Sequence, residues 1–402
     1  MTTESLKEGA SEIVRTLRAS GNRALLAGGC VRDLALGVEP KDFDIATDAL
    51  PEQVRELFRS CRLIGRRFRL AHVRVGPEII EVATFRAGEH LQGDRVTDAG
   101  RIVRDNVYGD IGDDVWRRDF TVNSLYYNIR DFSIVDYTGG MKDISERRLR
   151  FIGDPVQRYK EDPVRLLRAV RFAVKLGFRM DESIAGPIPQ MASLLQEIPP
   201  ARLFEEVLKL FLGGSAAQSF QQLRAFGLLD WLLPELERSL QGERGDQTAH
   251  LVQRVLQNTD QRLRDGKPVT PAFLFAAFLW EPMRVASERF LGDGVPQLDA
   301  LNLAADAVLS KQVAAVAVPR RLTKITREIW ILQPRFARNT EKRAARLFSH
   351  PRFRAGYDFL LLRHESGEDL GELCDWWAQY QEGRPKAEPP PKPHRSRRRP
   401  RA

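Results

Sequence analysis

The sequence is poor in cysteine and histidine and has no long apolar run. Its 402 residues include three cysteines and six histidines. Cys30, Cys61 and Cys374 lie far apart without a C-x-x-C motif, which argues against a disulfide framework or zinc knuckle and favours a reducing cytoplasm. The histidines show no ligand-like spacing. No stretch approaches the ~20 apolar residues of a membrane span, so we expect no membrane partner.

Outside one end of the chain, positive and negative side chains nearly balance, so the net positive charge is concentrated at that end. The formal net charge is +9, and the last 20 residues carry eight Lys or Arg against one Glu, so +7 of it lies there. Six prolines in the same segment exclude a packed helix or sheet. We expect a disordered basic tail over residues 383–402, in which Arg397, Arg398 and Arg399 bind nucleic-acid phosphates without reading sequence. A merely solubilising end is the alternative.

Local patterns divide the chain into a mixed front and a helical remainder. Residues 1–145 alternate strand-like runs such as ALLA and FDIAT with short helices, and two β-rich runs flank a Gly-Pro turn. From residue 146 onward nearly every segment is an amphipathic helix. The predicted fold is therefore an α+β head, a small mixed sheet with helices, at residues 1–145. An all-α neck at 146–235 and an all-α body and tail at 236–382 follow it.

The stretch ALLAGG, residues 24–29, ends an apolar strand in two glycines and leads into a predicted helix. Backbone N–H groups at a helix N-terminus favour phosphate. Gly28 and Gly29 are therefore candidates for binding the phosphates of a nucleotide, with Arg32 and Asp33 just behind them. Neither a G-x-G-x-x-G motif nor a P-loop is present, so a simple tight turn is the alternative.

Two aspartates follow the glycines at a short interval. Asp42 and Asp44 are separated by one residue of a strand-like segment, so both carboxylates should lie on one face. Such neighbours repel each other unless a cation lies between them; a solvated surface pair is the alternative. A phosphate site beside a Mg²⁺ site is what phosphoryl transfer requires. A third carboxylate, Asp119 in RRDFTVNSLYYN, is expected to open a helix beside Arg117 and Arg118.

Six segments in this order carry a resemblance to a known family. They span roughly residues 23–235 and read LLAGGCVRDLALG, KDFDIAT, EIIEVATFR, RRDFTVNSLYYN, YKEDPVRLLRAVRFAVKLGF and PPARLFEEVLKLF. The set resembles the class II nucleotidyltransferases, which comprise tRNA CCA-adding enzymes and bacterial poly(A) polymerases and are related in their catalytic head to DNA polymerase β. The resemblance implies an enzyme that extends RNA 3′ ends without a template.

The resemblance also implies roles for the site residues. Asp42 and Asp44 would hold two Mg²⁺ ions, one for activating the RNA 3′-hydroxyl and one for stabilising the departing pyrophosphate. Asp119 matches a third catalytic carboxylate in the poly(A) polymerase branch, whereas elsewhere in the class this aspartate is assigned to the ribose. The residues that would bind the nucleotide are Gly28, Gly29, Arg32, Asp33, Arg118, Asp162, Arg165, Arg168 and Arg171.

Protein side chains must read the incoming base because there is no template. The family does this from an EDxxR helix, here Glu161, Asp162 and Arg165. A carboxylate beside a guanidinium suits the donor and acceptor of adenine and equally those of cytosine, so the pair rejects guanine but leaves ATP and CTP open. A helix capped by Asp162, with Arg168 and Arg171 on a solvated stripe, is the alternative.

One segment favours the poly(A) polymerase branch. LIGRRFRLAHV, residues 63–73, resembles the signature of that branch and includes Arg66, Arg67 and Arg69, which we expect to bind RNA; an ordinary basic loop is the alternative. The basic tail points the same way, and partners in RNA decay are expected to contact it. The predicted function is therefore transfer of AMP from ATP to RNA 3′ ends, promoting RNA processing and decay, with a CCA-adding or partial CC- or A-adding enzyme as the alternative.

Overall fold

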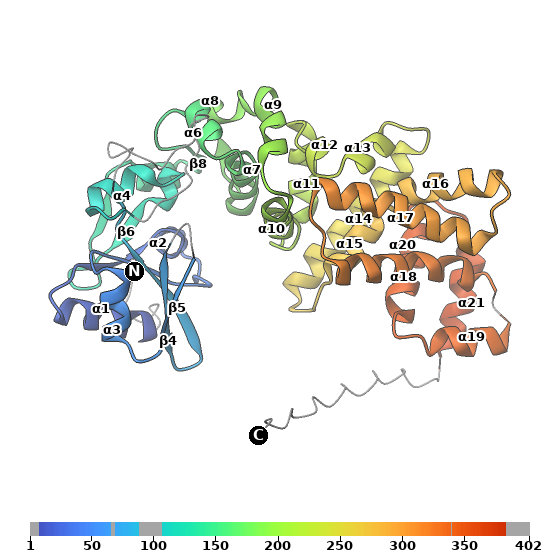
Figure 1. Ribbon diagram of the computed structural model, residues 1–402, viewed down its shortest axis with the longest axis horizontal. Coiled ribbons are helices and arrows are strands. Elements are labelled where there is room, and N and C mark those ends of the chain that lie inside the picture. The colour runs from blue at the N-terminus through green and yellow to red at the C-terminus, as the bar shows by residue number, and fades with distance from the viewer. Residues whose placement is uncertain (1–7, 66–68, 88–106, 339, 383–402) are drawn as a thin grey trace, which may run out of the picture. The chain divides into compact units, whose positions relative to one another are not determined.

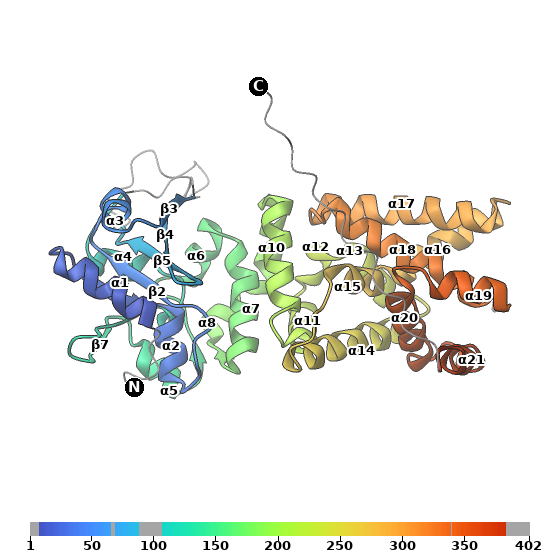
Figure 2. The same ribbon diagram turned by 90° about the horizontal axis from the view of Figure 1, so that it is seen from below.

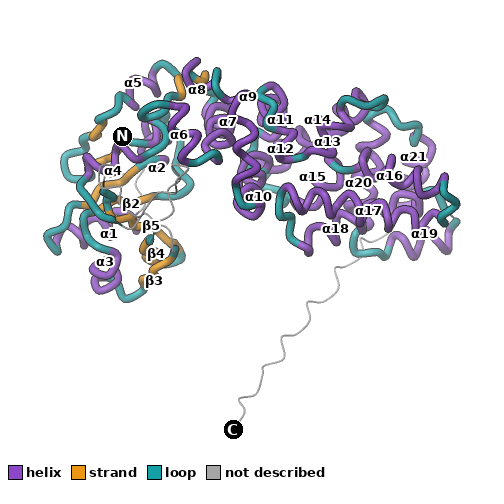
Figure 3. The backbone as a smooth tube through the Cα atoms, turned by 45° about the horizontal axis from the view of Figure 1, so that its top comes forward, coloured by secondary structure: helices purple, strands orange, loops and turns teal. Residues whose placement is uncertain are grey.

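The chain forms two compact units, Met1–Ile198 and Pro199–Ala402, in a computed structural model that describes residues 8–65, 69–87, 107–338 and 340–382 (Figure 1). The strands described all belong to the N-terminal unit, and helices build the C-terminal unit (Figure 3). This confirms the predicted fold class, a mixed sheet with helices followed by a helical remainder. The predicted disordered tail lies outside the described residues, and the division into head, neck and body remains a prediction.

A mixed sheet organises the N-terminal unit. In the described residues its strand order is β3-β4-β5-β2-β1-β6-β7. β2 and β5 are parallel, and the other neighbouring strands are antiparallel. The strands are β1 (Ala24–Ala27), β2 (Asp44–Thr47), β3 (Cys61–Ile64), β4 (Leu70–Val75), β5 (Glu78–Thr84), β6 (Leu125–Tyr127) and β7 (Ile134–Asp136).

Helices cover both faces of the centre of this sheet. The β1 sequence ALLA is buried throughout, as expected for a central strand whose two faces are both covered. Helix α1 (Glu8–Ala19) contacts β1, β2 and β5 and buries its apolar stripe, and α3 (Pro51–Leu57) packs beside it. On the other face α4 (Ile111–Arg117) packs against Leu25 and Tyr126.

Several local predictions are confirmed. Helix α2 (Gly29–Ala35) begins directly after the glycines, and β4 and β5 form a hairpin around the Gly-Pro turn. Helix α7 (Val164–Leu176) ends where Gly177 adopts the left-handed conformation, with φ 64°. These features are local because each depends on residues that adjoin in sequence.

The segment after Asp119 is not an α-helix, contrary to the prediction. Phe120 forms a β-bridge with Phe151, Thr121–Asn123 is a 3₁₀ turn, η2, and the chain then enters β6. The reason is tertiary: Tyr126 and its neighbours are large, β-preferring side chains that become fully buried when β6 pairs with β1.

The remaining elements of the N-terminal unit are short. They are α5 (Gly140–Ser145), β8 (Arg148–Leu149), α6 (Pro155–Glu161), β9 (Arg179–Met180), α8 (Glu182–Ala185), α9 (Ile188–Met191) and η3 (Ala192–Glu197). β8 and β9 form a separate parallel pair. Among the described residues, no helix combines the length and the apolar character that crossing a bilayer requires.

The C-terminal unit is a stack of helices in which α17 and α18 lie side by side (Figure 2). Its end is held by an aromatic cluster that includes Phe336, Phe353 and Trp377. The helices are α10 (Pro200–Phe211), α11 (Ala216–Ala225), α12 (Leu229–Leu232), α13 (Pro234–Leu240), α14 (Gly245–Arg264), α15 (Pro271–Phe278), α16 (Trp280–Gly292), α17 (Gln297–Ala315), α18 (Arg320–Phe336), α19 (Glu341–Phe348), α20 (Phe353–Glu365) and α21 (Gly371–Gln381).

Candidate active site

The turn between β1 and α2 requires glycine. Gly28 has φ 72° and ψ −126°, a conformation that residues with a Cβ rarely adopt. A Cβ at this position would lie 3.0 Å from Nη1 of Arg118 and 3.5 Å from the carbonyl oxygen of Asn123. The N–H of Gly28 donates to the carbonyl of Leu125 at 2.8 Å. Gly28 thus shapes the turn, and the N–H groups that remain for a phosphate begin at Gly29, the first residue of the helix.

Arg32 is buried behind this turn, with 3% of its surface exposed. Its Nε and Nη2 donate to Oδ1 of Asp33 at 2.8 and 2.6 Å, and its Nη1 donates to Oδ1 of Asn123. A guanidinium held by two acceptors has a fixed orientation, so less side-chain conformational entropy is lost when a ligand binds to it. The structure therefore brings Arg32 and Asp33 together immediately behind the glycines.

Arg118 is the charge nearest to Gly28. Its guanidinium donates to Oδ2 of Asp114 at 3.0 Å, to the hydroxyl of Tyr126 at 2.8 Å and to the carbonyl of Asn123 at 3.2 Å. Burial alone would lower the pKa of Arg118, but Asp114 and Tyr126 raise it above its usual value. The guanidinium consequently stays charged.

Asp42 and Asp44 belong to the same face of the sheet. Both side chains are exposed, whereas Phe43 and Ile45 are buried, so the alternation of β2 extends back through Asp42. Asp44 lies beside Glu81 in the parallel pairing of β2 with β5. The pKa of Asp44 is raised to about 6, mainly by partial desolvation of the carboxylate and then by the negative charge of Glu81. Arg118 opposes this rise, and Asp42 adds to it.

These carboxylates fit a hard divalent cation. Within the described residues no three His, Cys, Asp or Glu side chains already converge as a metal cluster. However, Asp42, Asp44 and Glu81 present oxygen ligands, which Mg²⁺ prefers, from neighbouring positions. Desolvation first, and then the charges of Glu81 and Asp42, raise the pKa of Asp44, and a cation bound beside it would favour the ionised carboxylate.

The carboxylate of Asp119 accepts hydrogen bonds from neighbouring groups of the protein. It accepts from Nε of Arg168 at 2.8 Å, from the N–H of Phe120 at 2.8 Å and from Nδ2 of Asn123 at 3.4 Å. Burial alone would raise the pKa of Asp119, but Arg168 and these hydrogen bonds lower it to about 2. The structure therefore pairs Asp119 with Arg168 of helix α7, and both its catalytic and its ribose role remain predictions.

The EDxxR segment forms the junction between α6 and α7. Glu161 and Arg165 are buried and form an ion pair with a 2.8 Å distance between Oε2 and Nη1, and that Nη1 also donates to the carbonyl of Arg158 at 2.9 Å. The Asp162 carboxylate accepts from the N–H of Val164 at 3.3 Å, so it contributes to capping α7. Capping fixes this side chain and is compatible with the predicted contact to a base.

Arg158 connects this junction to the segment that contains Asp119. It is 4% exposed, and its Nη1 pairs with Glu161 at 3.0 Å. Its Nη2 donates to the carbonyl of Arg117 at 2.9 Å and to the carbonyl of Arg118. These hydrogen bonds connect the junction between α6 and α7 to the C-terminal end of α4.

Comparison with known proteins identifies the family of this chain. Residues 24–150 match the family model described as the poly A polymerase head domain. The poly(A) polymerase I of Salmonella typhi is 48% identical over 415 residues, which cover 99% of this chain and 89% of that protein. The chain belongs to the bacterial poly(A) polymerase I family. It is accordingly a nucleotidyltransferase, and its reaction is the polyadenylation of RNA.

Two further family models match later parts of this poly(A) polymerase. Residues 177–240 match the model described as the probable RNA and SrmB-binding site of polymerase A. Residues 293–402 match its arginine-rich C-terminus.

CCA-adding enzymes are more distant relatives of this poly(A) polymerase. That of Lactobacillus helveticus is 36% identical over 212 residues, 53% of this chain and 52% of that protein. The solved CCA-adding enzyme of Bacillus stearothermophilus in complex with CTP has a TM-score of 0.65 at 24% identity, covering 94% of this chain and 82% of that one. The structural likeness shows a shared fold.

Three of the predicted arginines of the poly(A) polymerase surround one aromatic ring. The guanidinium carbons of Arg171, Arg168 and Arg32 lie 4.5, 5.4 and 5.6 Å from the centroid of the Phe172 ring. Cations over an aromatic face are attracted by its quadrupole, so the ring helps to hold like charges together. The structure thus gathers predicted nucleotide-binding residues from α2 and α7.

The predicted RNA-binding arginines are only partly observed. Arg69 forms an ion pair with Glu52 at 2.8 Å, and its side chain is 45% exposed, so the pair is a weak surface interaction. The others, Arg66, Arg67, Arg397, Arg398 and Arg399, lie outside the described residues.

Sequence reasoning did not single out Glu81 or Asn123. Glu81 lies in the alternating segment EIIEVATFR, and only the parallel pairing of β2 with β5 places it beside Asp44. Asn123 bonds Arg32, Arg118 and Asp119 with three different groups, its side-chain oxygen, its carbonyl and its amide nitrogen. Asn123 lies between two other polar residues, Thr121 and Ser124, so the sequence carried no signal that distinguished it.

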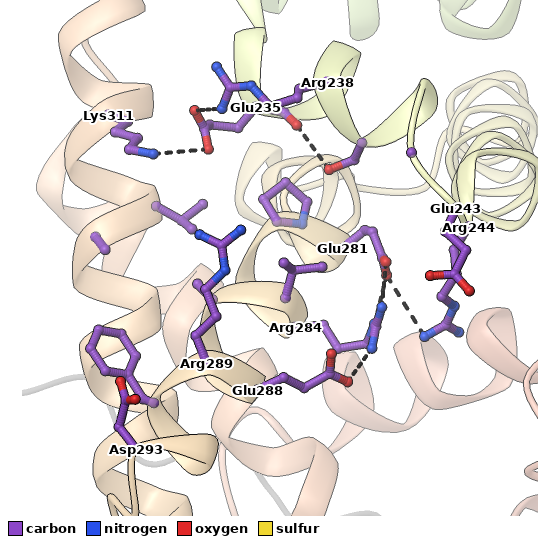
Figure 4. A pocket seen from close by; sticks show the side chains of 18 residues that line it. Glu235, Arg238, Glu243, Arg244, Glu281, Arg284, Glu288, Arg289, Asp293 and Lys311 are labelled. Atoms are coloured by element: carbon purple, nitrogen blue, oxygen red, sulfur yellow. Dashed lines mark hydrogen bonds and ion pairs between the residues drawn. The ribbon is translucent and has the colours of Figure 1, made fainter.

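A separate charged groove of about 720 Å³ lies in the C-terminal unit (Figure 4). Its charges pair mainly with one another: Glu281 with Arg284 at 2.6 Å, and Glu235 with Arg238 at 2.5 Å and with Lys311 at 3.3 Å. None of the predicted site residues lines it. Such mutual pairing accounts for the charges of these five residues without a ligand.

Proposed function

We propose that this poly(A) polymerase transfers AMP from ATP to RNA 3′-hydroxyls at a site where Asp42, Asp44 and Glu81 hold Mg²⁺. The observation that carries the proposal is geometric: Asp44 pairs in register with Glu81, Asp42 and Asp44 are both exposed on that face, and the guanidinium of Arg118 lies beside the glycine turn. Bound there, Mg²⁺ would supply activation of the attacking hydroxyl and charge compensation for the departing pyrophosphate. Asp42 and Asp44 are the predicted ligands, Glu81 is proposed as a further oxygen ligand, and Asp119 keeps its predicted catalytic role.

The triphosphate is assigned to the β1–α2 turn. Arg32 and Arg118 provide two fixed positive charges, and their hydrogen bonds to Asn123 keep both guanidinium groups near Gly28. Arginines that are oriented before a ligand arrives stabilise phosphate charge at little reorganisation cost. The N–H of Gly29 adds a backbone donor at the first turn of the helix.

The adenine base is assigned to Asp162 and Arg165. Glu161 and the carbonyl of Arg158 fix the position of the Arg165 guanidinium, and Asp162 is held by its capping contact. A carboxylate accepts from the N6 amino group of adenine, and a guanidinium donates to N1. Arg168 and Arg171 contribute positive charge beside this pair, around Phe172.

The RNA partner and the cellular role follow from the family and from the charge. Generic RNA 3′ ends are the proposed substrate, bound in part by the tail arginines, and RNA processing and decay are the proposed role. The family match described as an RNA and SrmB-binding site supports a protein partner in this process. All three cysteines are free thiols, which supports a reducing cytoplasm.

The test is extension of an unstructured RNA with each nucleotide supplied separately, read on a denaturing gel. ATP with Mg²⁺ is expected to give a ladder of many adenosines, and CTP is expected to be incorporated poorly. Addition of one to three nucleotides, confined to tRNA that lacks its CCA end and dependent on CTP, would instead favour the CCA-adding alternative.

A further inference from the structure

Four side chains form a row across the sheet on the face that carries Asp44. Asp44 of β2 pairs with Glu81 of β5, Glu81 with His72 of β4, and His72 with Arg62 of β3. Side chains that are paired in register project to the same face and lie within contact distance. The carboxylates therefore occupy one end of the row and the basic side chains occupy the other.

His72 touches Glu81 directly. Its Nε2 lies 3.1 Å from Oε1 of Glu81, and the two side chains are 26% and 50% exposed. A carboxylate accepts hydrogen bonds, so Nε2 carries the proton of this bond. The half-exposed Glu81 side chain has several rotatable bonds, and this contact restricts the positions that its carboxylate occupies.

We propose that His72 is a positioning residue, which holds the Glu81 carboxylate beside Asp44 in the orientation needed to bind the divalent cation. The inference rests on the proposed function of Asp44 and Glu81. It assigns a task to one residue of LIGRRFRLAHV, the segment whose arginines were expected to bind RNA. His72 acts through Glu81 and contacts neither nucleotide nor RNA in this proposal.

The metal affinity of the full-length chain, measured without nucleotide or RNA, is the decisive quantity. Free Mn²⁺ is followed by electron paramagnetic resonance at one fixed pH. His72→Leu removes the donor and keeps a side chain that strands tolerate, and we expect Mn²⁺ affinity to fall about three- to tenfold, the loss typical of one hydrogen bond. His72→Gln keeps an amide donor near the position of Nε2 and is expected to recover most of the affinity.

A matched control comes from the same strand. Arg74 lies two residues from His72 on β4, is exposed and pairs in register with Ile79 of β5. Arg74→Leu makes the same type of change on the same face without touching Glu81, and its Mn²⁺ affinity is expected to equal that of the wild type. Unfolding temperatures measured without metal identify any variant that has lost its fold.

The double variant decides whether His72 acts through Glu81. In a Glu81→Gln background, His72→Leu is expected to have no further effect on Mn²⁺ affinity, because the group that it positions is already altered. An equal loss in both backgrounds overturns the inference, as does wild-type affinity of folded His72→Leu. Asp44→Asn separates the two levels: if it also binds Mn²⁺ like the wild type, the proposed metal site itself is wrong.

Discussion

Replacing Asp44 with Asn is expected to stabilise the N-terminal unit while it removes activity. Partial desolvation and the negative charges of Glu81 and Asp42 oppose the ionisation of Asp44 and raise its pKa from 3.8 to about 6. For an enclosed carboxyl that difference is worth about 3 kcal/mol. Asp44 retains solvent contact, so screening reduces the expected gain to about 1 kcal/mol at pH 8 without metal.

The gain should depend on pH with a defined sign. Between pH 4 and pH 6, approximately, native Asp44 binds more protons than the unfolded chain, so its contribution to stability decreases as the pH rises through this range. Asn does not titrate. The variant and the wild type should therefore be almost equally stable near pH 4 and should diverge above pH 6. Added Mg²⁺ should stabilise the wild type at pH 8 and leave the variant unchanged.

Hydrogen exchange of the β1 and β2 amides, read by mass spectrometry, monitors this unit separately from the helical one. Comparing variant and wild type at the same pH cancels the intrinsic exchange rates. Glu56→Gln, which alters an exposed carboxylate on α3, serves as the control and should show no difference that depends on pH. The reasoning is refuted if Asp44→Asn is less protected than the wild type at pH 8, or if the difference between them is independent of pH.

Three further changes test other parts of the site. Gly28→Ala should cost about 1–3 kcal/mol of stability because alanine disfavours this backbone conformation. It should also raise the KM for ATP, because the new Cβ displaces Arg118. Gly37 has the same φ of 72° but nothing within 4 Å of a new Cβ, so the control variant Gly37→Ala should raise KM little. Asp162→Ala should lower the kcat/KM preference for ATP over GTP about tenfold, and unchanged ratios would leave Asp162 with the capping role alone. Deleting residues 383–402 should flatten the log–log salt dependence of RNA binding by about 0.7 for each lost phosphate contact, whereas an identical slope would mean that the tail does not touch RNA.

Sequence patterns predicted the parts of this molecule that depend on neighbours along the chain. The glycine turn, the two aspartates of the β2 segment and the glycine that ends α7 are of this kind. The prediction of a helix after Asp119 was wrong because burial of β6 in the sheet, a tertiary effect, decides the conformation of that segment. Glu81 was missed for a related reason, since its place beside Asp44 depends on which strands pair.

The contacts of Arg158 have a consequence for which substitutions this chain tolerates. Its acceptors at the C-terminal end of α4 are the main-chain carbonyls of Arg117 and of the next residue, Arg118, which every amino acid supplies. Replacement of either side chain therefore leaves the link between α4 and α6 intact. A change at Arg158 removes both of these hydrogen bonds, so a genetic screen for loosened base choice should recover substitutions at Arg158 more often than at Arg117.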